Sequence, residues 1–233
     1  MKDSQPSFVL FAIASVLAVS ARVMEWELLE LIAKPMVIPA IFYYYLQTKT
    51  RKTSIQLSAI LAVFFIGDMI ILLDSGGLFG VMVCGMIAHL LLISQATSDR
   101  MGLNFSLFNI TVLALLLLLP SYVLYTLLQM GVNNIDENYF FFLSYGVILI
   151  AMVAISVINY LSHGDTASLY LATLAIALLV SDLLYSISKF IIPMPLLEQI
   201  NLVSQFMAYY FIVRYYNARR ELKMKKAYGG NRD

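Results

Sequence analysis

The chain has 233 residues, of which 61% are hydrophobic and only 12% are charged, and its formal net charge is +1. A soluble domain carries about 25% charged residues on its solvated surface, so this composition excludes an ordinary water-soluble domain and predicts a chain covered mostly by lipid. The near-neutral charge argues against a nucleic-acid partner. The single cysteine, Cys84, excludes an intramolecular disulfide.

Apolar stretches long enough to cross a bilayer recur along the chain. Crossing the hydrocarbon layer takes about 20 residues of α-helix, and open strands would leave backbone groups unpaired in lipid. We therefore predict an all-α polytopic membrane bundle of about eight transmembrane helices, forming a single transmembrane domain over residues 1–233. The predicted spans are 7–21, 31–46, 54–73, 78–95, 106–128, 139–161, 168–191 and 196–216, followed by a basic cytoplasmic tail over 217–233.

Two of these spans allow a second interpretation. The first follows Lys2 and ends near Val19-Ser20-Ala21, which is also the pattern of a cleaved signal peptide. The fifth contains Pro120, which favours a kink within one helix over a break between two.

Lys and Arg in the loops predict the orientation, because they gather on the cytoplasmic side. With eight spans both termini share one side, and eleven basic residues fall there against two, Arg22 and Lys189, on the other. Both termini are therefore expected in the cytoplasm. The eleven are Lys2, Lys49, Arg51, Lys52, Arg100, Arg219, Arg220, Lys223, Lys225, Lys226 and Arg232.

Four ionisable side chains lie inside the predicted spans: Lys34, Asp68, His89 and Asp182. A charge at the bilayer centre costs at least about 2.5–3.5 kcal/mol, so such residues face a bundle interior or a cavity. At 1.5 Å rise per residue, all four fall in the outer half or the middle of the membrane. Asp68 could instead form a structural ion pair with Lys34, but four such groups at overlapping depth favour a functional site.

Two further spans carry polar stripes at helical spacing. The eighth presents Glu198, Asn201, Gln205 and Tyr209, and the sixth presents Tyr145, Met152, Ser156 and Asn159. Several helices are thus expected to direct polar faces into a shared interior.

With these residues the chain resembles the YhhN-like family of eight-span membrane proteins, which includes the lysoplasmalogenases. The family pattern has Lys-Pro in the second span, Gly-Asp in the third, His in the fourth, Tyr in the sixth, Ser-Asp in the seventh and Gln in the eighth. The matching residues, in order between about 31 and 213, are Lys34-Pro35, Gly67-Asp68, His89, Tyr145, Ser181-Asp182 and Gln205. Three positions depart from the pattern, because Gly85, Leu92 and Asn201 stand where the family has aromatic residues.

The resemblance implies hydrolysis of the vinyl ether bond of a lysoplasmalogen to a fatty aldehyde and a glycerophospho-head group. The substrate would be a lysophospholipid held in membrane lipid, and no metal or organic cofactor is required. Asp182 is expected to act as the acid and Asp68 as the ionised partner, although the two assignments could be exchanged. The expected substrate-binding or supporting residues are Lys34, His89, Tyr145, Ser181, Asn201 and Gln205.

Two functions of other classes remain open. The same carboxylates could serve a carrier or channel for a small solute or protons, although the central spans show little of the Gly/Pro interruption typical of transporter helices. A non-catalytic lipid-binding protein would keep the same fold.

Overall fold

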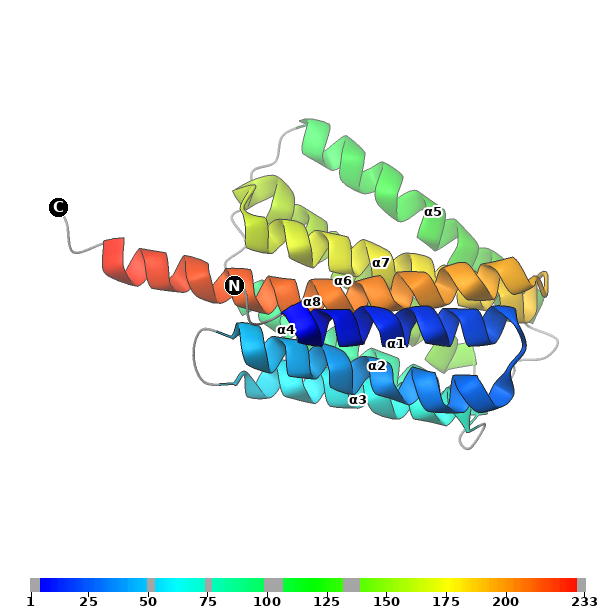
Figure 1. Ribbon diagram of the computed structural model, residues 1–233. Coiled ribbons are helices and arrows are strands. Elements are labelled where there is room, and N and C mark those ends of the chain that lie inside the picture. Colours follow the sequence, from blue (N-terminus) through cyan, green and yellow to red (C-terminus); the bar gives the residue numbers. More distant parts are fainter. Residues whose placement is uncertain (1–4, 50–52, 74–76, 99–106, 132–138, 230–233) are drawn as a thin grey trace.

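The computed structural model of the protein describes residues 5–49, 53–73, 77–98, 107–131 and 139–229. Within these ranges the chain forms eight α-helices and no strands, which confirms the all-α membrane fold (Figure 1). The helices are α1 (Gln5–Val23), α2 (Glu27–Thr48), α3 (Ile55–Leu72), α4 (Gly77–Ser98), α5 (Leu107–Gly131), α6 (Tyr139–His163), α7 (Thr166–Phe190) and α8 (Pro195–Gly229).

Seven of these helices, α1 to α7, are long and apolar enough to cross a membrane. The described part of α8 does not meet that measure, because polar residues such as Glu198, Asn201 and Gln205 interrupt its apolar sequence. These residues line the interior of the bundle, where polar groups have partners. α8 also continues as a helix to Gly229, well beyond residue 216, where the sequence places the end of the last span.

Local sequence explains several helix ends. Asp165 caps α7, since its carboxylate accepts a hydrogen bond from the Ser168 backbone N–H at 2.7 Å. Pro195 opens α8, a position where the missing N–H of proline costs nothing. The helix α5 runs through Pro120 as one element.

The helix contacts form a ring. Each helix in the order α1, α2, α3, α4, α6, α7, α8 packs on the next, and α8 packs back on α1. α5 stands outside this ring, where it contacts α6 and α7 and leans away from the other helices (Figure 1). α8 also contacts α2 and α3, so it is the helix that joins the two halves of the chain.

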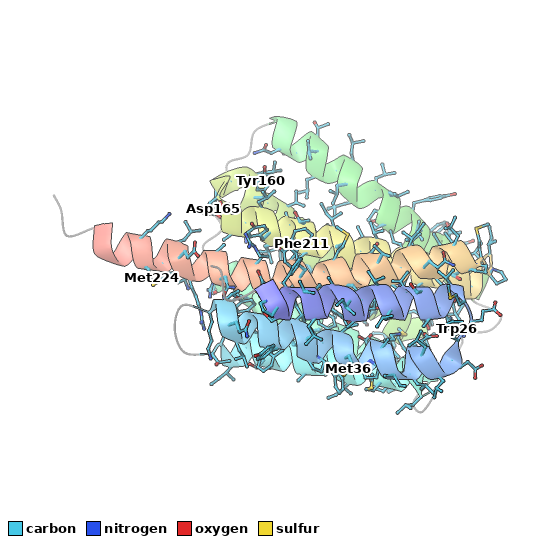
Figure 2. The ribbon with its side chains drawn as sticks, in the orientation of Figure 1. Trp26, Met36, Tyr160, Asp165, Phe211 and Met224 are labelled. Atoms are coloured by element: carbon cyan, nitrogen blue, oxygen red, sulfur yellow. The ribbon has the colours of Figure 1, made fainter. Side chains whose placement is uncertain are left out.

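The beginning of α1 and the end of α8 lie toward the same end of the bundle (Figure 1). Trp26, on the turn between α1 and α2, lies at the opposite end, and Met224 marks the part of α8 that projects beyond the other helices (Figure 2). Of the basic residues used to predict orientation, five lie outside the described residues: Lys2, Arg51, Lys52, Arg100 and Arg232.

Candidate active site

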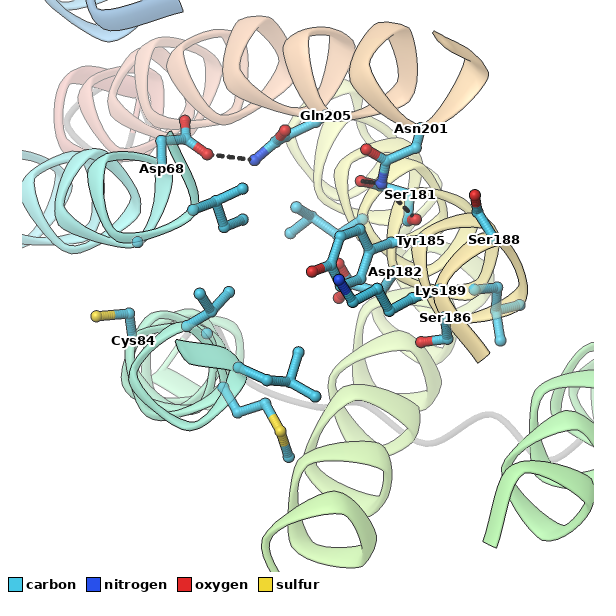
Figure 3. Close-up of a pocket in the computed structure, with 18 of the residues that line it drawn as sticks. Asp68, Cys84, Ser181, Asp182, Tyr185, Ser186, Ser188, Lys189, Asn201 and Gln205 are labelled. Atoms are coloured by element: carbon cyan, nitrogen blue, oxygen red, sulfur yellow. Dashed lines mark hydrogen bonds between the residues drawn. The ribbon is translucent and has the colours of Figure 1, made fainter. Parts of the chain in front are cut away.

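A cavity of about 880 Å³ lies between the helices (Figure 3). Its lining includes Arg22 and Glu27, which flank the α1–α2 turn at the end of the bundle away from the beginning of α1 and the end of α8. Seven helices, α2 to α8, supply its walls, and Arg22 at the end of α1 reaches its mouth. The mouth carries charged residues such as Glu27 and Lys189, which are exposed. The walls deeper in are mostly apolar.

The cavity brings together all eight residues that the sequence singled out for a site, and these come from six different helices. They are Lys34, Asp68, His89, Tyr145, Ser181, Asp182, Asn201 and Gln205. Asp68 lies on the α3 side of the cavity and Asp182 on the α7 side (Figure 3).

Asp68 is buried, with 3% of its surface exposed, and two residues of α8 hold its carboxylate. Gln205 donates from Nε2 to Oδ1 at 2.8 Å, and the Tyr209 hydroxyl donates to Oδ2 at 2.8 Å. Gln205 Nε2 also donates to the Tyr209 hydroxyl at 2.8 Å, which closes the network. Both oxygens are within hydrogen-bond distance of a donor, and an ionised carboxylate can accept both bonds.

The structural ion pair between Asp68 and Lys34 that the sequence left open is not formed. The ion pairs within the described ranges join Arg22 to Glu30 and to Glu198, and Lys34 takes part in neither. Lys34 is buried in the cavity wall, where its charge interacts with Asp68 without a direct ion pair. Asp68 instead pairs with the neutral donors of α8, because those side chains approach it directly.

Asp182 has a different environment. It is partly exposed, and its Oδ2 accepts a hydrogen bond from the Tyr145 hydroxyl of α6 at 2.5 Å. A protonated carboxyl could keep this bond on Oδ2 while its proton sits on Oδ1. Asp182 can therefore present a proton to the cavity, whereas both oxygens of Asp68 are engaged.

Gly85 of α4 allows Tyr145 to take this position. A Cβ atom at Gly85 would lie 2.6 Å from Cε2 of Tyr145, a distance that would force the ring to move. Gly85 is one of the three positions that depart from the family pattern. The closeness of Tyr145 explains why a glycine stands there.

His89 of α4 also lines the cavity. It is 1% exposed, and neither ring nitrogen has a hydrogen-bond partner within the described part of the chain. Its ring lies 5.5 Å from that of Tyr145, centroid to centroid. Buried polar groups are normally hydrogen-bonded, so this imidazole is suited to bind a polar group within the cavity.

Ser181 and Asn201 link the helices behind the site. Asn201 donates to the Ser181 carbonyl at 2.7 Å and to its hydroxyl at 3.0 Å. This pair joins α8 to α7 one residue before Asp182, so it fixes the position of that carboxylate.

The polar stripe predicted for the sixth span reaches the cavity only in part. Tyr145 lines it, whereas Ser156 donates to the Met152 carbonyl and Asn159 donates to the Ala96 carbonyl in the opposite half of the bundle. The stripe is one face of α6, but the cavity occupies only one end of that face. Conversely, the predicted site set omitted Tyr209, although its place in the eighth-span stripe was the signal that could have found it.

The site thus contains two carboxylates in unequal hydrogen-bond environments, in a cavity between the helices that carries charged residues at its mouth. Such a pair can divide proton donation and charge stabilisation between its members. No group of three or more His, Cys, Asp or Glu suited to a metal ion occurs among the described residues.

The fold and the cavity define an integral membrane protein with an intramembrane polar site. Residues 29–216 match the sequence model of the YhhN family, and the chain belongs to that family. The match runs from α2 into α8, so it includes every helix that builds the cavity walls and leaves α1 outside. No curated protein and no solved structure matches the chain.

Proposed function

We propose that the protein is a lysoplasmalogenase-like hydrolase, which cleaves the vinyl ether bond of a lysoplasmalogen to a fatty aldehyde and a glycerophospho-head group. Family membership supports the proposal, since the YhhN family resemblance implies this reaction. The observation that carries it is the environment of Asp182, which lines the cavity and has one carboxylate oxygen held by the Tyr145 hydroxyl.

The reaction needs a proton at carbon. The β-carbon of the vinyl ether accepts the proton of Asp182, and the α-carbon and its oxygen then form an oxocarbenium ion. Water adds to the α-carbon and loses a proton, and the resulting hemiacetal collapses to the aldehyde and the free glycerol hydroxyl. The proton lost by water returns to the Asp182 carboxylate, so the protein ends the cycle unchanged.

Asp68 suits the second role, stabilisation of the cation. Its ionised form accepts hydrogen bonds from Gln205 and Tyr209 and lies in a site shielded from bulk water. A fixed negative charge in such a site stabilises a developing positive charge more strongly than it would in water. Glycosidases use paired carboxylates in the same way for an oxocarbenium-like transition state.

The apolar walls can hold the alkenyl chain. Apolar residues of α6 and α7 line the cavity, among them Leu149, Ile150, Leu178 and Leu179. The charged mouth lies at the bundle end, where a head group would meet water. A lysophospholipid can thus bind with its chain among the helices and its reacting bond near the carboxylates.

The test is aldehyde release by the purified protein in detergent or liposomes. We expect a lysoplasmalogen to yield fatty aldehyde, and the analogue with a saturated ether bond to yield none, because only the vinyl ether can be protonated at carbon. A correctly folded protein that releases no aldehyde from any lysoplasmalogen would overturn the proposal. Solute or proton flux into liposomes in that case would favour a carrier that uses the same carboxylates.

A further inference from the structure

One face of α7 carries a row of polar side chains from Asp182 to the mouth of the cavity. Tyr185, Ser186 and Lys189 follow Asp182 at three, four and seven residues, and all four residues line the cavity. This spacing places them on a single side of a helix. In Figure 3 the Lys189 amine points into the cavity on the same side as Asp182.

Lys189 differs from the other cations of the cavity in its charge environment. Arg22 is neutralised at the mouth, where it forms ion pairs with Glu30 and Glu198. Lys34 is buried in the wall with Asp68 nearby. Lys189 is exposed, and no ion pair joins it to a carboxylate within the ranges that the structure describes. Its charge is therefore available to an anionic ligand.

We propose that Lys189 and Ser186 form a phosphate-binding subsite, which holds the phosphate of a glycerophospholipid while its chain extends into the cavity. Hydrolysis of the bond held near Asp182 rests on the function proposed above. The phosphate subsite does not depend on that function. An ammonium and a hydroxyl are both donors to phosphate oxygens.

The dimensions of the ligand fit this row. Lys189 is seven residues beyond Asp182, or about 10.5 Å along the helix axis. Its side chain leans back toward the helix N-terminus, as side chains on helices do, so its ammonium lies closer to the level of Asp182 than its Cα does. In a glycerophospholipid the phosphorus and the ether oxygen at the far end of the glycerol are roughly 6 Å apart at standard bond lengths. A phosphate at Lys189 therefore sets the ether bond at the level of Asp182.

A simpler role for Lys189 is stabilisation of the end of α7. A lysine in the last turn of a helix interacts favourably with the helix dipole, and Lys189 occupies that turn. The two roles differ in what they predict. If Lys189 only stabilises the helix end, its replacement changes the stability of the protein and does not distinguish between ligands. If Lys189 binds phosphate, its replacement lowers the affinity only for ligands that carry a phosphate.

The experiment compares two ligands that the proposed reaction does not consume. Hexadecyl-glycerophosphocholine and hexadecylglycerol share a saturated ether-linked chain, and only the first carries a phosphate. Equilibrium binding of each is measured with purified protein in lipid nanodiscs, for the wild type and for Lys189→Gln, Lys189→Arg and Ser186→Ala. Lys49→Gln is the matched control, because Lys49 donates to Thr53 at the other end of the bundle and does not line the cavity.

We expect Lys189→Gln to weaken binding of the phosphate-bearing ligand about tenfold, the order of one lost charge-assisted hydrogen bond, and to leave hexadecylglycerol unchanged. Lys189→Arg should restore most of the affinity, Ser186→Ala should have a smaller effect in the same direction, and Lys49→Gln should have none. Equal losses for both ligands, or no loss for either, would overturn the phosphate subsite. The protein could prefer the phosphate-bearing ligand through Lys189 and yet release no aldehyde. That result would support the phosphate subsite and refute the hydrolase.

Discussion

Gly85 and Tyr145 are in contact at a point where any larger residue than glycine would displace the tyrosine. A Cβ atom at Gly85 would lie 2.6 Å from Cε2 and 3.1 Å from the hydroxyl oxygen of Tyr145. That hydroxyl donates to Oδ2 of Asp182 at 2.5 Å. A position on α4 thus controls the hydrogen bond between α6 and the carboxylate of α7.

Gly85→Ala should therefore reduce turnover by moving Tyr145 away from Asp182, by roughly tenfold if one hydrogen bond is lost. Tyr145→Phe should reduce it to a similar extent, and Gly85→Ala should add little in that background because the bond is already absent. Gly80→Ala on the same helix is the control, since its Cβ would meet only the Ile70 side chain, at 3.3 Å from Cδ1 and 3.6 Å from Cγ2. Equal activity of the Gly85 and Gly80 variants in the aldehyde assay would contradict this prediction.

The two carboxylates can be tested by isosteric replacement. Asp68→Asn and Asp182→Asn should each lower vinyl ether hydrolysis by at least about 10²-fold, the lower range for general acid–base catalysis. Because the groups act as a unit, the double variant should lose little beyond the worse single one. Asp165→Asn should leave activity intact, since Asp165 caps α7 outside the cavity and Asn is also a good cap. Near wild-type turnover in folded variants of both cavity aspartates would assign them to helix packing or ion conduction.

The Asp68 network should contribute to stability. Tyr209→Phe removes a donor from a buried carboxylate, and the group left without its partner costs about 1–3 kcal/mol. We expect the free energy of unfolding in detergent to fall by that amount. Tyr122→Phe should be neutral, because Tyr122 is 64% exposed on α5, and α5 packs on α6 and α7. A Tyr209→Phe protein as stable as the wild type would show that Gln205 alone satisfies Asp68.

The orientation in the membrane is a separate prediction. The excess of Lys and Arg on one side predicts that both termini lie in the cytoplasm. Reporter domains fused after Asp136 and after Asp233 should report opposite sides of the membrane. The same side for both would mean that the chain does not cross the membrane three times between Asp136 and Asp233, as the sequence predicts.

The sequence by itself determined the class of fold and the direction in which its polar groups point. Apolar stretches of bilayer length leave α-helix as the only state that satisfies the backbone in lipid, and the eight predicted spans fall on the eight helices that the structure describes. The cost of charge in lipid placed Asp68 and Asp182 toward the interior, and both line the cavity. These inferences succeed because each depends only on the residues of one helix and on the lipid around it.

Only the tertiary structure decided which groups meet. The sequence offered Lys34 as a partner for Asp68, but Gln205 and Tyr209 hold that carboxylate. Helical spacing placed Ser156 and Tyr145 on one polar stripe, but only Tyr145 of the two lines the cavity. Helical periodicity fixes the face on which a side chain lies and not the helix that this face meets. The order of helices around the ring, with α5 outside, sets those neighbours, and it is established by packing across the whole bundle rather than by any local pattern.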